Sequence, residues 1–164
     1  MIKCPSCKGL YMEFDGPTHS YMASSAGCWQ AYSELLAKEY SDLKYWENHR
    51  LTVDSYAVQH PGVESKQSIQ SVAVHLVSLC LVLENNISQS YATESLKKLT
   101  SYQFHWLIPP TDMGQINVNT VLIAQDHVSH NAAVKDWAHS VWRCWKEHHQ
   151  TVRKWARFVC DTPP

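Results

Sequence analysis

Apolar residues at helical spacing constrain the fold of this chain more than any other feature of its sequence. The clearest example is the segment 68–84, where apolar residues recur at steps of three and four on one face and also occupy the opposite side. These residues are Ile69, Val72, Leu76, Leu79 and Leu83 on the first face, and Val74, Val77 and Leu81 on the second. A helix that is apolar on all sides normally lies at the centre of a bundle.

Pro and Gly residues divide the rest of the chain into further helical segments. Ser24 or Ser25 can cap the first helix, and Pro61-Gly62 ends the second. Asn117 can cap another helix. The segment that follows Asn117 is rich in β-branched residues, so a strand is the alternative there. We expect helices over 25–43, 45–59, 68–84, 118–128 and 132–159, a short amphipathic piece over 92–102, and a long loop over 103–117.

This pattern predicts an all-α fold, a bundle of five or six helices preceded by a Cys-x-x-Cys zinc-knuckle extension. The 164 residues are enough for one domain with its own apolar core, and neither a repeat nor a low-complexity linker divides them. We therefore predict a single domain over 1–164, with a metal-binding extension over 1–23 and the helical bundle over 24–160.

The extension contains the sequence CPSCKG, a tight turn that directs two thiolates to one point. Cys4 and Cys7 are two ligands, and a structural zinc ion needs four. The nearest further ligands are His19 and Cys28, so we predict a Cys3His zinc site built from Cys4, Cys7, His19 and Cys28. The alternatives are a redox pair or thiols without a role. Cys28, in the first turn of a helix, could also be a nucleophile or a small buried apolar residue.

A second group of polar residues lies in and just after the expected helix 45–59. We select His49, Asp54 and His60 as candidate catalytic residues, with one histidine as general base or metal ligand and Asp54 orienting it. His49 and His60 stand roughly 16 Å apart on a straight helix, so they would need partners from other helices. The alternative is structural: Asp54 pairs with Arg50 one turn earlier, and His75 is a hydrogen-bonded core histidine.

Composition and charge argue against two classes of partner. Fourteen Lys and Arg residues face fifteen Asp and Glu residues, so we expect no nucleic-acid partner. The longest apolar block, over 72–83, is too short to span a bilayer, and the N-terminus resembles no leader peptide, so we expect no membrane partner. Both points favour a cytoplasmic protein, in which cysteines stay reduced.

Three segments, GPTHSYMASSAGCW, HRLTVDSYAVQHPG and SVAVHL, together with the Trp- and His-rich tail, resemble a family of small bacterial proteins of unknown function. The resemblance covers nearly the whole chain through GPTHxYxxSSxGCW-like and HRLTVDxYAxQHPG-like segments. It implies that the Cys-x-x-Cys turn, His19, Cys28 and the segment 49–60 belong to one unit. It supplies no reaction and no substrate.

We therefore expect a zinc-binding helical protein, for which two roles remain open. It could be a metal-dependent or acid–base enzyme acting on a small molecule through the segment 49–60. It could instead be a zinc-stabilised protein–protein interaction module without catalysis, which would use exposed aromatic residues such as Trp106.

Overall fold

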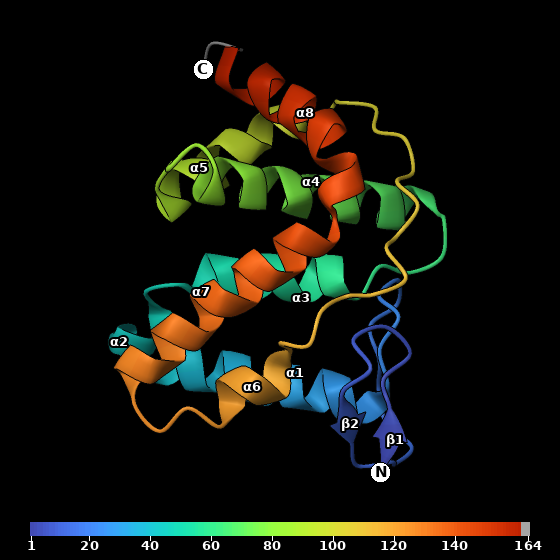
Figure 1. Ribbon diagram of the computed structural model, residues 1–164, viewed down its shortest axis with the longest axis vertical. Coiled ribbons are helices and arrows are strands. Elements are labelled where there is room, and N and C mark those ends of the chain that lie inside the picture. The colour runs from blue at the N-terminus through green and yellow to red at the C-terminus, as the bar shows by residue number, and fades with distance from the viewer. Residues whose placement is uncertain (162–164) are drawn as a thin grey trace.

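The computed structural model describes residues 1–161 as a helical protein with a small N-terminal hairpin (Figure 1), which confirms the all-α fold. In chain order the elements are β1 (Ile2–Lys3), β2 (Leu10–Tyr11), α1 (Ala26–Ser41), α2 (Leu43–Trp46), α3 (His49–Gln59), α4 (Lys66–Leu83), α5 (Gln89–Ser95), the 3-10 helix η1 (Leu96–Leu99), α6 (Val118–Leu122), α7 (His127–Cys144), the 3-10 helix η2 (Lys146–His148) and α8 (His149–Asp161).

Helix α4 is the central element of the bundle. It packs against α3 on one side and α8 on the other, and α7 crosses α3 (Figure 1). Its buried residues include Val72, Leu76 and Leu79, as expected for a helix that is apolar all round. By length and composition alone α4 could cross a membrane, but half of it is buried inside the protein, and the core helix of a soluble protein passes the same test.

Short polar side chains begin most of the helices, as the sequence indicates. Ser25 caps α1 by accepting a hydrogen bond from the backbone N–H of Cys28, and Asn117 caps α6. Asp126 caps α7 in the same way. The expected helix over 118–128 is therefore a short helix, α6, followed by a turn and the start of α7, and the alternative of a strand is wrong.

Two expected helices are interrupted. The segment 45–59 is divided at Asn48, between α2 and α3, and Asn48 is buried with its side chain donating to Asn131. The final helix begins at His127 and turns near Trp145, between α7 and α8. The indole N–H of Trp145 donates to the carbonyl of Val58 at 3.1 Å, so this fully buried ring holds the bend against α3. The bend lets α7 pack on α3 while α8 packs on α4.

The predicted loop over 103–117 forms no helix or strand and runs along the outside of the bundle. One buried side chain fastens it. The amide of Gln59 donates to the carbonyls of Met113 at 2.9 Å and Ile116 at 2.8 Å, and its oxygen accepts from the indole of Trp137. Trp106 in this loop is half-buried and packs against the core.

The N-terminal hairpin lies against the start of α1. Its two strands pair antiparallel, with Ile2 opposite Tyr11. A Cβ atom at Gly27 would collide with the backbone carbonyl of Met12, so the hairpin can approach α1 this closely only because residue 27 is glycine. The chain then returns past the end of α3, where the N–H of Ala23 donates to the carbonyl of His60. The hairpin, α1 and α3 thus meet at one place.

Candidate metal centre

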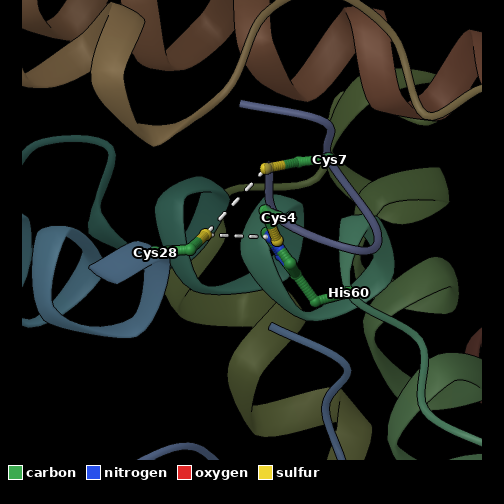
Figure 2. A group of neighbouring side chains, drawn as sticks. All are labelled: Cys4, Cys7, Cys28 and His60. Carbon is green, nitrogen blue, oxygen red and sulfur yellow. Dashed lines mark hydrogen bonds between the residues drawn. The ribbon is translucent and has the colours of Figure 1, made fainter. Parts of the chain in front are cut away.

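Four side chains from these three segments converge on one buried point (Figure 2). Cys4 and Cys7 come from the hairpin turn, Cys28 from the first turn of α1, and His60 from the residue after α3. Their ligand atoms all lie within 4.8 Å of one another. No side chain in the group is more than 3% exposed. Three thiols and an imidazole in a common buried position form a Cys3His donor set.

Backbone hydrogen bonds shape the turn that carries the first two cysteines. The N–H of Cys4 donates to the carbonyl of Gly9, and the N–H of Lys8 donates to the carbonyl of Cys4. Lys8 adopts a left-handed conformation with φ of 60°, which allows the chain to fold back within six residues. Both thiols consequently point to the same side of the turn (Figure 2).

The distances between the donor atoms suit a small tetrahedral ion. With zinc–sulfur bonds of about 2.3 Å, ligands at tetrahedral angles lie about 3.8 Å apart. The Sγ atoms of Cys7 and Cys28 are 3.9 Å apart, and Cys28 Sγ lies 3.3 Å from Nε2 of His60. These two separations are close to those between the ligands of a four-coordinate metal ion.

A backbone carbonyl sets the orientation of the His60 ring. Nδ1 of His60 lies 2.8 Å from the carbonyl oxygen of Tyr56, which can only accept a hydrogen bond, so Nδ1 carries a proton. Nε2 is thereby directed at the thiols. A hydrogen bond to the far nitrogen is the usual way in which proteins orient a metal-binding histidine.

Two tyrosine hydroxyls contact the sulfur atoms. Tyr56 donates to Cys28 Sγ at 3.6 Å, and the hydroxyl of Tyr11 lies 3.6 Å from Cys7 Sγ. Tyr56 is itself held between the rings of His60 and Tyr32, at centroid distances of 4.0 and 3.8 Å. O–H donors to sulfur stabilise the charge that a thiolate carries.

The electrostatics of the four groups favour charge separation in the absence of metal. The thiols of Cys28 and Cys7 donate to Cys4 and hold the pKa of Cys4 far below its usual range, while the same interactions and burial raise the pKa of Cys28. Burial by itself lowers the pKa of His60, but Cys4 and Cys7 outweigh it and raise this pKa to about 9. Both shifts favour an ionised Cys4 beside a protonated His60, and binding of a divalent cation would release the proton from His60.

The structure brings together three of the four ligands predicted from the sequence. Cys4, Cys7 and Cys28 lie in the cluster, and the fourth member is His60 in place of His19. The imidazole of His19 packs edge-on against Tyr21 and Trp29, and its Nδ1 accepts from the N–H of Tyr21. His19 is held by this local turn, and its aromatic contacts keep it out of the cluster.

The three candidate catalytic residues lie in three different environments. His60 belongs to the cysteine cluster. His49 is 2.6 Å from the buried carboxylate of Glu39 and stacks on Trp46. Asp54 is fully buried and faces neither of the other two, because Arg50, His75 and Ser78 surround its carboxylate. Asp54 thus pairs with Arg50, as the structural alternative predicted, and it also contacts His75.

His60 is a candidate catalytic residue on sequence grounds, but the structure places it with the three cysteines. Its position directly before Pro61-Gly62, which ends α3, is the one signal that could have indicated it as a ligand. The turn at this point directs the ring inward, toward a hairpin that lies more than thirty residues earlier in the chain.

The fold and the site together define an all-helical protein with a buried Cys3His cluster that can hold a metal ion. The chain belongs to a family of unknown function, DUF5946, whose model matches residues 2–146 and so includes all four cluster residues. No curated protein and no solved structure matches it.

Proposed function

We propose that this chain is a zinc-binding protein in which one zinc ion fastens the N-terminal hairpin to α1 and α3. The observation that carries the proposal is the convergence of Cys4, Cys7, Cys28 and His60, whose ligand atoms all lie within 4.8 Å of one another. A thiolate-rich set of four ligands favours zinc over magnesium, calcium or manganese, which prefer oxygen ligands.

The arrangement supports a structural role for the ion. All four positions are supplied by the protein, and the ligands are buried, so no coordination position is open to a substrate. The ligands also come from three separate segments, the hairpin turn, α1 and the residue after α3, so one ion would join all three. Structural zinc can contribute on the order of 10 kcal/mol to folding.

The thiols support a reducing location, and we propose the cytoplasm. All six cysteines of the chain are free, including Cys7 and Cys28, whose sulfur atoms are neighbours. An oxidising compartment would favour a disulfide between thiols so placed and would compete with metal binding.

A zinc-stabilised interaction module is the alternative role, and one observation favours it. Large apolar side chains are exposed on and around the hairpin, beside a shallow groove against α1. They are Met1, Ile2, Leu10, Met12 and Phe14. Under this alternative the zinc ion would order a surface for a protein partner, and Trp106, half-buried in its loop, would contribute little.

Metal content of protein purified without a His-tag tests the zinc proposal, with a histidine pair as the matched comparison. We expect one equivalent of zinc in the wild type and in His19→Ala, and its loss in His60→Ala and in the double variant Cys4→Ser/Cys7→Ser. Both histidine variants remove one imidazole, but only His60 belongs to the cluster.

Two results would overturn the proposal. The first is a wild-type protein that contains no metal after purification without chelators and with zinc added. Loss of zinc in His19→Ala with full retention in His60→Ala would show that the ion is held elsewhere. Circular dichroism of the two histidine variants identifies any that fails to fold, and Cys4→Ser alone then repeats the test.

A further inference from the structure

The buried carboxylate of Asp54 is the centre of a second polar network, separate from the cysteine cluster. Arg50 donates to both of its oxygens, from Nε at 3.1 Å and from a terminal nitrogen at 2.9 Å, and Ser78 donates to one of them. Nδ1 of His75 lies 2.7 Å from the other. A fully buried carboxylate costs several kcal/mol of desolvation unless it is paired, and here both oxygens are paired.

This network determines the tautomer of His75. The carboxylate of Asp54 is paired with the Arg50 guanidinium and accepts the Nδ1–H of His75, so the Nε2 lone pair of a neutral ring is left free. Within residues 1–161 no group hydrogen-bonds to Nε2. A buried carboxylate that orients an imidazole in this way is the usual means of preparing histidine as a base.

His75 also borders an open groove of about 510 Å³ along the first turns of α4. Its side chain is 18% exposed, and because Nδ1 points inward to Asp54, the edge that carries Nε2 is left to face the groove. The other lining residues supply an ammonium, two carboxamides, an alcohol and a phenol, and none of them is acidic. They are Lys66, Gln67, Gln70, Ser71 and Tyr21, with Val74.

We propose that this groove is a hydrolytic site for small carboxylic esters, in which His75 is the general base and Asp54 its positioning residue. The donors along the walls suit the carbonyl oxygen of an ester and the negative charge that develops on it. The site shares no residue with the proposed zinc cluster, so either proposal can fail without the other.

The step needs only water as a second reactant. Nε2 of His75 accepts a proton from a water molecule while the water oxygen forms a bond to the ester carbonyl carbon. The tetrahedral intermediate then breaks its bond to the alcohol oxygen, and the proton held by His75 passes to the leaving alcohol. The products are a carboxylic acid and an alcohol, and the imidazole returns to its starting form.

Hydrolysis of p-nitrophenyl acetate by the full chain is the test, because release of p-nitrophenolate is followed directly by absorbance. We expect His75→Gln to lower the rate by ~10²-fold, the order of a general-base contribution. The control is His139→Gln, which removes an exposed histidine on α7 and should leave the rate unchanged. Zinc content should be the same in wild type, His75→Gln and His139→Gln.

A spectroscopic measurement separates positioning by Asp54 from a general effect on folding. Long-range ¹H–¹⁵N spectra of the wild type should show His75 protonated at Nδ1 and free at Nε2. The Asp54→Asn variant should lose both this tautomer preference and the hydrolysis rate.

Three outcomes would overturn the proposal: a His75→Gln rate equal to that of the wild type, a wild-type rate no higher than that of free imidazole, or protonation at Nε2 in the wild type. The third outcome is measured on the wild type alone, so it can be read even if a variant fails to fold.

Discussion

Tyr56 touches the candidate metal centre through three different parts of one residue. Its carbonyl oxygen accepts the hydrogen bond that orients His60, its ring stacks on the same imidazole, and its hydroxyl donates to Cys28. The contact of the carbonyl with His60 depends only on the backbone of α3, so any residue at position 56 can make it. The hydroxyl contact with Cys28 requires tyrosine. The side chain can therefore be tested without disturbing the orientation of His60.

Tyr56→Phe should hold zinc less firmly than the wild type. The substitution removes one O–H donor to sulfur, which contributes about 1 kcal/mol, so zinc should transfer to a competing chelator several-fold faster. Tyr32→Phe is the control, because Tyr32 packs against the same ring, and no hydrogen bond from its hydroxyl to a cluster sulfur is found within residues 1–161. A chromogenic chelator measures the transfer of zinc. Equal rates of zinc release from Tyr56→Phe and Tyr32→Phe would contradict this expectation.

The residues of the centre differ in how far the sequence could reveal them. Cys4 and Cys7 were recognisable because their geometry is local to one turn, and Cys28 because it is the nearest further thiol along the chain. His60 was assigned to another group, since its approach depends on how the end of α3 packs against the hairpin. His19 was the nearer histidine along the chain, and proximity in sequence did not predict proximity in space.

At the scale of elements, one carboxylate links three helices. Glu39 of α1 is fully buried, and it accepts hydrogen bonds from His49 and Thr52 of α3 and from His130 of α7. Burial by itself raises the pKa of Glu39, but these hydrogen bonds outweigh it and hold the pKa below its usual value. The ionised form of Glu39 is thus more stable in the folded protein than in the unfolded chain.

This gives a pH-dependent prediction for Glu39→Gln. Because the folded-state pKa lies below the unfolded value near 4.5, the stabilisation is fully present above that value and is lost as the pH falls through the folded-state pKa. The variant should lose about 2–3 kcal/mol of unfolding free energy at pH 7. The deficit should shrink in acid.

Urea unfolding of wild type and variant across this range measures the deficit. Glu34→Gln serves as the control, since Glu34 is on the same helix but exposed, with a hydrogen bond only to Gln30 among the described contacts. A deficit that stays constant with pH would contradict the assignment of the effect to the ionised carboxylate.

The bend between α7 and α8 has no signal in the sequence. Apolar residues keep helical spacing from α7 through α8, and no Pro or Gly marks the bend between them. The bend arises because buried Trp145 bonds to the carbonyl of Val58 on a different helix. Helix α4 was predictable for the opposite reason, since apolar residues occupy both of its sides over 72–83 and favour a central position.

At the scale of the whole molecule, the zinc proposal divides the stability of the protein into a metal-dependent and a metal-independent part. Under that proposal the ion strengthens the attachment of the hairpin, which also packs against the bundle through buried Tyr11 and at Gly27. The α4–α8 pair is held by apolar packing and by a two-point contact in which Arg153 donates to both oxygens of Glu84 at 2.7 Å.

Removal of zinc should therefore affect the two parts unequally. After treatment with excess EDTA, amide hydrogen exchange should rise most in β1, β2 and the chain leading to α1, and least in α4 and α8. The reason is that the cluster joins the hairpin to the bundle, whereas the α4–α8 contact contains none of its ligands. Exchange that rose uniformly along the chain would show instead that the ion supports the whole fold.

The order of the ligands along the chain has a consequence for biosynthesis. All four precede α4, so the ion can be enclosed while the ribosome is still adding the helices that form most of the core. At synthesis rates of about 5–20 residues per second, only about 3–10 s separate the emergence of Cys7 from that of His60. A growing chain that captured zinc in this interval would present α3 already held in place, as a template on which α4 and then α7 could dock.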